Sequence, residues 1–93
     1  MALFAVHYTY STATSDARDV HRATHRAWLA ELLEQNVLVS SGPFSDGSGA
    51  LIIVEGTDLD SVRTLFAQDP FATQNLVEQC TINEWKPVMG AFV

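Results

Sequence analysis

Two histidines one helical turn apart are the side chains in this sequence most suited to chemistry. They lie in residues 19–33, where one stripe of a predicted helix consists of His21, His25, Trp28, Leu29 and Leu32. A surface helix turns such a stripe towards its core. An imidazole held there is partly shielded from water, so its protonation can be tuned around neutral pH. The same position also suits a core histidine that only hydrogen-bonds a backbone carbonyl, and the helix alone leaves both interpretations open.

The composition limits the class of protein. A chain of 93 residues, 47% hydrophobic and 17% charged, is typical of a single globular domain over residues 1–93. Eleven acidic against five basic side chains give a formal charge of −6, which argues against nucleic acid and anionic membranes as partners. No apolar run approaches the roughly 20 residues of a membrane helix, and no signal peptide is evident. The single cysteine, Cys80, cannot form an internal disulfide, and we expect a cytoplasmic protein.

The chemistry-bearing residues must be positioned by six predicted elements, in the order strand, helix, strand, strand, helix, strand. The strands are predicted at residues 3–10, 37–41, 50–55 and 76–85. The first helix is expected to run from a cap at Ser15 or Asp16 to about Glu34. The second is expected to open at a capping box over residues 57–60 and to end before Pro70, with an irregular segment at 71–75.

This order is that of the ferredoxin-like βαββαβ fold, of class α+β, which has a four-stranded antiparallel sheet with both helices on one face. Because successive elements alternate in direction, several separate segments meet at one end of the sheet. They are the end of the first strand with Tyr8 and Tyr10, the start of the first helix, the connection from Ser41 to Asp46, and the end of the second helix with Asp69. Imidazoles, carboxylates and hydroxyls meet there, which favours a functional site at this rim.

A series of short motifs runs in order from the first helix to the last strand. They are Arg22-x-x-His25 followed by Leu29, the segment Leu38–Pro43, Asp46-Gly47, Asp69-Pro70-Phe71 and Ile82-x-x-Trp85. In this order and spacing they resemble the YCII-related (YciI-like) family. The resemblance implies a dimeric α/β barrel with a His–Asp active-site pair, here His25 and Asp69. It also implies a family in which most members have no assigned reaction, with one branch that removes chloride from a chlorinated hydroxyhydroquinone.

For His25 and Asp69, the chemical interpretation is a general acid/base oriented by a carboxylate. A carboxylate bonded to one ring nitrogen fixes the tautomer and leaves the other nitrogen to move protons. The alternative is that Asp69 only satisfies helix-terminal amides. Substrate-binding side chains are expected among Ser41, Asp46, Arg22, His21, Trp28 and Phe71. Of these, Asp46 also suits a turn, Trp28 and Phe71 also suit the core, and His21 also suits the surface.

The spacing of His21 and His25 could hold a metal, with Asp69 or Asp46 as a third ligand. A His-x-x-x-His pattern without an internal Glu is a weak metal signal, so neither metal nor another cofactor is expected. Two functions stay open. One is a small enzyme of lyase, isomerase or dehydrohalogenase type acting on a small polar or phenolic metabolite. The other is a non-catalytic dimeric module that binds a ligand or a partner chain.

Both faces of the predicted sheet carry apolar side chains. In the first strand Leu3 and Ala5 alternate with Phe4 and Val6, and residues 51–54 are apolar throughout. Two helices can cover only one face, and a large exposed apolar surface marks an interface. We therefore expect a homodimer in which the open sheet faces pair about a two-fold axis.

Overall fold

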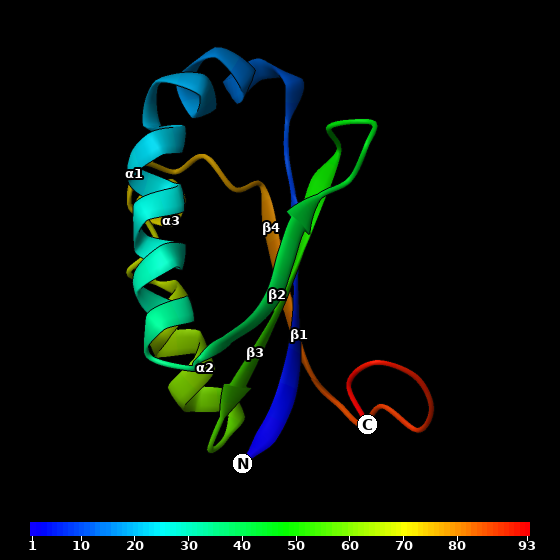
Figure 1. Cartoon of the computed structure of the whole chain (residues 1–93). Helices are drawn as coiled ribbons and strands as arrows, with labels where there is room; N and C mark the ends of the chain where they lie inside the picture. The colour runs from blue at the N-terminus through cyan, green and yellow to red at the C-terminus, as the bar shows by residue number, and fades with distance from the viewer.

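A four-stranded antiparallel sheet carries all the helices on one of its faces in the computed structural model, which describes residues 1–93 (Figure 1). The strands are β1 (Ala2–Thr9), β2 (Leu38–Pro43), β3 (Gly49–Gly56) and β4 (Gln79–Trp85), and they lie in the order β2-β3-β1-β4. The helices are α1 (Ser15–Glu34), α2 (Leu59–Phe66) and α3 (Pro70–Thr73), with a 3-10 turn, η1 (Thr12–Thr14), before α1. The predicted ferredoxin-like α+β fold is confirmed.

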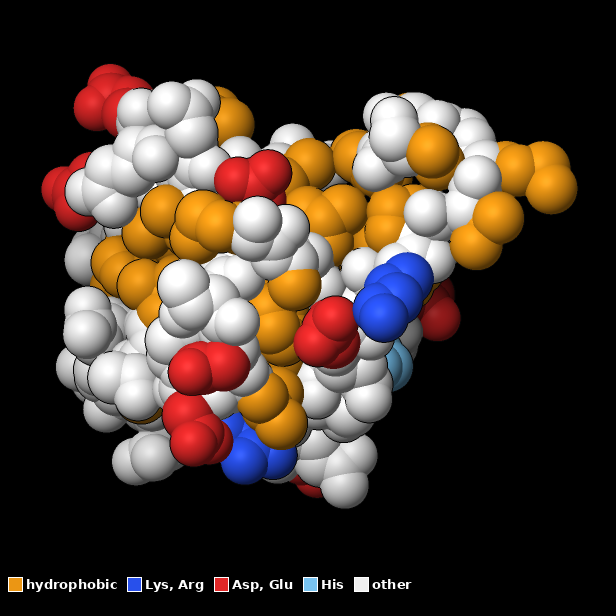
Figure 2. Space-filling view, turned by 90° about the horizontal axis from the view of Figure 1, so that it is seen from below, with side chains coloured by type: hydrophobic (Ala, Val, Ile, Leu, Met, Phe, Trp, Pro, Cys, Tyr) orange, Lys and Arg blue, Asp and Glu red, His pale blue; other side chains and the backbone are white.

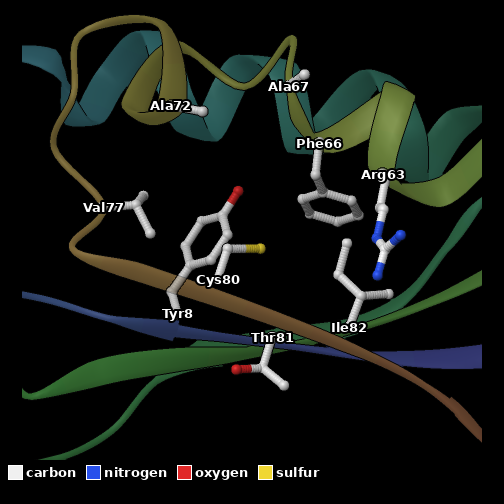
Figure 3. Close-up of a pocket in the computed structure, with 9 residues that line it drawn as sticks. All are labelled: Tyr8, Arg63, Phe66, Ala67, Ala72, Val77, Cys80, Thr81 and Ile82. Carbon is white, nitrogen blue, oxygen red and sulfur yellow. The ribbon is translucent and has the colours of Figure 1, made fainter. Parts of the chain in front are cut away.

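The core lies between the sheet and the helices because side chains alternate across each strand. In β1, Phe4, Val6 and Tyr8 are buried on the helix side. Their partners across the ladder to β3 are Val54, Ile52 and Ala50, which are also buried. The helices complete the core with Leu29, Leu32, Val62 and Phe66. Tyr8 is therefore anchored in the sheet with its hydroxyl directed towards the helix layer, as Figure 3 shows.

The ends of the two longer helices differ in detail from the prediction. Asn36 has a φ of 60° after α1, a left-handed conformation that asparagine tolerates and that often ends a helix. The predicted cap at Ser15 or Asp16 is wrong, because η1 runs directly into α1 and both residues are helical. The capping box starts one residue later than predicted. The side chain of Asp58 accepts from the amide of Ser61 at 2.8 Å, and the Ser61 hydroxyl completes the box.

Pro70 begins a helix instead of ending one. The second helix, α2, ends at Phe66, and Pro70 is the first residue of α3, where the missing N–H of proline costs no hydrogen bond. The predicted irregular segment at 71–75 is therefore helical in part. Asp69 becomes the N-cap of α3, since its side chain accepts from the amide of Phe71. The last strand starts at Gln79, three residues later than predicted, and Leu76 packs as a buried residue before it.

No helix covers the other face of the sheet, which we call the open face (Figure 1). Leu51, Trp85 and Phe44 are exposed there. The last residues, 86–93, curl on the same side, where the rings of Trp85 and Phe92 lie 5.8 Å apart. Figure 2 shows hydrophobic side chains gathered on this projecting tail. None of the helices is both long and apolar enough to cross a membrane.

Gly49, at the start of β3, offers a test of the β1–β3 register. A Cβ at this position would lie 1.9 Å from the backbone oxygen of Tyr8, which is held in the central ladder. We expect Gly49→Ala to destabilise the fold by about 1–3 kcal/mol, measured by urea unfolding. Gly42→Ala is the matched control, because no atom lies within 4 Å of its Cβ. Equal unfolding midpoints for the two variants would contradict this register.

Candidate active site

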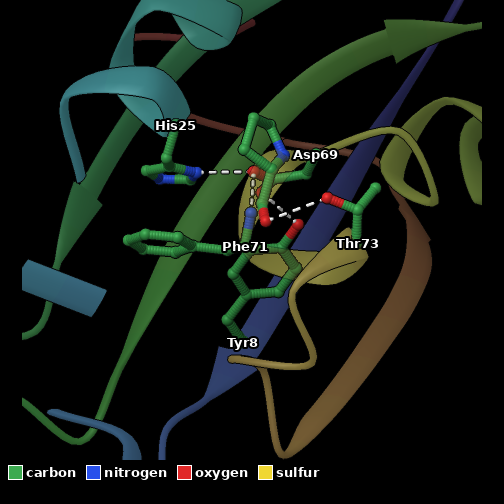
Figure 4. A network of polar contacts seen from close by, with 6 residues as sticks. Tyr8, His25, Asp69, Phe71 and Thr73 are labelled. Carbon is green, nitrogen blue, oxygen red and sulfur yellow. Dashed lines mark hydrogen bonds and ion pairs between the residues drawn. The ribbon is translucent and has the colours of Figure 1, made fainter. Parts of the chain in front are cut away.

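Asp69 is the buried centre of the candidate site, with 0% of its surface exposed. Its Oδ2 accepts a hydrogen bond of 2.7 Å from the hydroxyl of Tyr8, and its Oδ1 accepts one of 3.0 Å from the amide of Phe71 (Figure 4). Its Oδ1 also lies 2.7 Å from Nδ1 of His25. Burying a carboxylate is costly unless hydrogen bonds replace its water. Here three donors from β1, α1 and α3 do so, and they fix the position of both oxygens.

His25 lies on α1 with its ring held from two directions. Its Nδ1 faces Asp69, and its ring is stacked on Phe71 with centroids 3.9 Å apart and planes within 1° (Figure 4). Since Asp69 only accepts, Nδ1 carries the proton and Nε2 keeps its lone pair in the neutral ring. The residue is only 7% exposed. Every buried side-chain nitrogen or oxygen has a partner, so Nε2, which has none within the chain, is accessible.

The space next to His25 is a pocket of about 390 Å³ between α1 and β2, which we call the α1–β2 pocket. Its walls come from residues 22–33 of α1 and from β2, its floor from β3, and its end from Phe71. Polar side chains in the lining are Tyr10, Arg22, His25, Arg26 and Ser41. The accessible nitrogen of His25 is therefore presented to a largely apolar space that also contains hydroxyl and guanidinium donors.

Two tyrosines next to this site remain protonated at neutral pH. Burial raises the pKa of Tyr8 far above its ordinary value, and the nearby Asp69 raises it further. Burial, and then Asp69, also raise the pKa of Tyr10, while Arg18 and Arg22 lower it. A phenol that keeps its proton is a hydrogen-bond donor. Tyr8 uses this donor on Asp69, and Tyr10 lines the α1–β2 pocket.

Arg18 is a buried cation that the sequence analysis missed. It is only 5% exposed, and its guanidinium donates to the backbone oxygens of Ser11 and Leu76 and to the hydroxyl of Thr14. It also lies over the ring of Tyr10, 4.3 Å from the centroid. These contacts fix the N-terminal turn of α1 against the segment before β4 and hold Tyr10 in place. The available signal was its position seven residues before His25, on the same face of α1.

A second cavity, of about 460 Å³, lies between α2, α3 and β4 on the other side of Tyr8 (Figure 3). It is lined by Phe66, Val77, Cys80 and Ile82 with Arg63 at one side. Burial raises the pKa of the Cys80 thiol, and Asp69 raises it further, so this thiol is a weak nucleophile. His25 does not line this cavity. The second cavity therefore lacks the imidazole that could transfer protons near neutral pH.

The structure brings together five of the predicted site residues and leaves three apart. Four of the five line the α1–β2 pocket, and the fifth, Asp69, lies behind it in contact with His25. The four are His25, Phe71, Arg22 and Ser41. Asp46 does not line the pocket; its side chain accepts a hydrogen bond of 2.9 Å from the amide of Ser48 in an exposed turn. Hydrogen bonding to the side chain and backbone of Ser48 lowers the pKa of Asp46. Trp28 packs edge-on against Phe66 in the core. His21 lies outside the pocket lining, and no three His, Cys, Asp or Glu side chains cluster to hold a metal.

The fold and the site define a class of protein. It is a ferredoxin-like α+β domain in which hydrogen-bonded Tyr, Asp and His side chains lie beside a pocket. The sequence profile of the YCII-related domain matches residues 2–86, and the chain belongs to this family. It is 32% identical over 82 residues to the uncharacterized protein YjpA of Bacillus subtilis (strain 168), covering 85% of this chain and 95% of that protein. The 5-chloro-2-hydroxyhydroquinone dehydrochlorinase TftG of Burkholderia phenoliruptrix AC1100, solved in complex with 2,5-dihydroxybenzoquinone, shares the fold. Its TM-score is 0.80 at 24% identity, over 90% of this chain and 93% of that one.

The raised pKa of Tyr8 predicts a loss of stability at alkaline pH. An unfolded tyrosine titrates near pH 10, whereas folded Tyr8 keeps its proton beyond that value. Its contribution is therefore fully present below about pH 10 and is lost as the pH rises further, because the unfolded state releases the proton first. We expect the unfolding free energy to fall above pH 10, and to fall less steeply in Tyr8→Phe. That variant is also expected to be about 1–3 kcal/mol less stable at pH 7, since Asp69 loses a donor.

The measurement is urea unfolding at several pH values, together with phenolate absorbance in the folded protein. Tyr10→Phe serves as the control, because it leaves Tyr8 as the only phenol. Phenolate formation near pH 10 in folded Tyr10→Phe would contradict the buried contact between Tyr8 and Asp69.

Proposed function

We propose that this protein is a small-molecule enzyme that uses His25 and Asp69 as an acid/base pair, in a lyase, isomerase or dehydrohalogenase type of reaction that needs no cofactor. The observation that carries the proposal is the 2.7 Å contact between Nδ1 of His25 and Oδ1 of Asp69. It leaves Nε2 as the free nitrogen of a ring that lines the α1–β2 pocket.

In the proposed reaction, Nε2 of His25 takes a proton from a carbon or hydroxyl of the substrate. The positive charge that forms on the imidazole is stabilised by the Asp69 carboxylate, which Tyr8 and the amide of Phe71 hold in place. The stacked ring of Phe71 limits rotation of His25. The imidazolium then returns the proton to another atom of the substrate or to the leaving group. Such positioned proton transfer contributes about 10²–10⁴-fold to a rate.

The solved structure with the same fold is that of a dehydrochlorinase, an enzyme that removes a proton and a chloride from its substrate. This supports a reaction of the same type for this chain. For this chain, the corresponding step would transfer the proton to Nε2 of His25 and release chloride into the pocket. We therefore propose small phenolic compounds as the first substrates to test. The same pocket would also serve a non-catalytic binding module, and the experiment below separates the two functions.

The first assay measures turnover of chlorinated hydroxyhydroquinones by the chloride that they release. The second assay uses NMR to measure how fast the unchlorinated compounds take up deuterium from heavy water. We expect His25→Gln and Asp69→Asn each to lower the rate by about 100-fold or more, with the far-ultraviolet circular dichroism unchanged. His21→Gln is the matched control, because His21 lies on the same helix as His25 but outside the lining of the pocket. Undiminished turnover in His25→Gln would disprove the acid/base role. Compounds that bind the wild type without any turnover would favour the binding module.

We also propose a homodimer formed through the open face. The support is the run of exposed apolar side chains on this face and on the adjoining tail, which include Leu51, Trp85, Val88 and Met89. A second copy of the chain presents the same apolar surface, so pairing about a two-fold axis would bury both.

The lone, unpaired Cys80 is compatible with the cytoplasm as the compartment.

A charge placed on the open face should break this dimer. We expect the wild type to sediment as a dimer at micromolar concentration and Leu51→Glu to sediment as a monomer. Val20→Glu is the control, because Val20 is also apolar and is even more exposed than Leu51, but lies on α1. A wild-type monomer, or a dimer that tolerates Leu51→Glu, would refute this assembly.

A further inference from the structure

The α1–β2 pocket differs in charge from the rest of the molecule. The chain has eleven acidic and five basic side chains, yet no Asp or Glu lines this pocket, whereas Arg22 and Arg26 both do. Both arginines lie on the wall of α1 that carries His25, at one turn or less from it. The Asp69 carboxylate lies behind His25 and is already paired there, so the lining itself presents two guanidinium groups and no carboxylate to a ligand. This is an electrostatic environment suited to an anion.

The two arginines differ in how free they are to bind a ligand. Arg22 is paired with Asp19 on the same helix, so part of its charge is already neutralised. Arg26 is exposed and forms no ion pair. Its guanidinium can therefore offer two parallel N–H donors, the geometry that matches a carboxylate. We infer that Arg26 makes the main contact with the anion and that Arg22 supports it.

The hydroxyls in the lining are also unoccupied. Neither Tyr10 nor Ser41 uses its side-chain hydroxyl in a hydrogen bond within the chain, and both line the pocket. Tyr10 follows the end of β1 and Ser41 lies in β2, so both face the ligand space from a different side than α1 does. Tyr10 keeps its proton because burial raises its pKa, and it can donate to a ligand oxygen. Free donors on three elements therefore surround one space.

The remainder of the lining describes the rest of the ligand. The pocket is bounded by Leu29, Leu33, Leu38 and Ile52, which favour an apolar or aromatic body. A phosphate would be expected at the first turn of a helix or in a glycine-rich loop, where backbone amides are free. This pocket is instead lined by the middle and end of α1, where the amides are used within the helix. These features favour a carboxylate over a phosphate.

We propose that the substrate of this pocket is a small carboxylic acid with an apolar or aromatic body, whose carboxylate is held by Arg26 and Arg22 beside His25. The inference rests on the proposed use of the α1–β2 pocket as the substrate site. It adds a charge requirement that the acid/base pair alone does not impose.

The test compares benzoate with benzamide, which has nearly the same shape but no charge, by calorimetry and by NMR of the folded protein. We expect benzoate to bind about tenfold or more tightly than benzamide, because it alone makes charge-assisted hydrogen bonds. Arg26→Gln should remove most of this preference, and Arg22→Gln should remove less because of Asp19. Arg63→Gln is the control, since this exposed arginine lines the other cavity. Added salt should weaken the binding of benzoate more than the binding of benzamide.

Equal affinities for benzoate and benzamide, no benzoate binding at millimolar concentration, or a preference that survives Arg26→Gln would each overturn the inference. These outcomes are separable from failure of the proposed function. Turnover that depends on His25 but shows no preference for acids would leave the acid/base pair standing and reject the carboxylate. An Arg26-dependent preference for benzoate without turnover of any compound would support the carboxylate and reject the enzyme.

Discussion

The buried carboxylate of Asp69 is the group on which the rest of the site depends. It is removed from water completely, so its charge is tolerated only because Tyr8, His25 and the amide of Phe71 all donate to it. Those donors come from three different elements, β1, α1 and α3. One ionic group therefore joins the sheet to both helical segments that cover this end of it. The same hydrogen bonds that make its burial acceptable also determine which nitrogen of His25 faces the pocket.

The sequence contained enough information to predict the fold and the central pair. Hydrophobic periodicity placed two histidines on one face of α1, and the alternating directions of the elements brought Asp69 to the same rim. The resemblance to the YCII-related family then implied His25 as the partner of Asp69. The contact between Tyr8 and Asp69 spans 61 residues and has no local signal, so only the rim position of Tyr8 could be predicted. Arg18 was missed because a basic residue in the first turns of a helix is normally solvent-exposed. Its burial depends on carbonyl groups supplied by distant turns.

The prediction at Pro70 was wrong, and for Asp46 the structure shows the turn that the sequence analysis gave as an alternative. Proline both terminates and initiates helices, and the sequence around residue 70 did not decide between these roles. The structure uses it to start α3, which turns Asp69 into a cap as well as a partner of His25. The two interpretations that were posed as alternatives for Asp69 therefore hold together geometrically. Asp46 precedes Gly47, which has a φ of 76°, and the requirement of this turn for a short acceptor accounts for its position.

The two walls of the α1–β2 pocket belong to one continuous stretch of the chain, from Arg22 to Pro43. The support of the His–Asp pair comes from elsewhere, from Tyr8 in β1 and from residues 69–71. Substitutions at the other positions of this stretch, with His25 kept, can therefore reshape the ligand space while the carboxylate and its donors stay in place. This separation makes the fold adaptable: a library confined to about twenty neighbouring positions around a fixed His25 would sample new ligands on an unchanged proton-transfer centre.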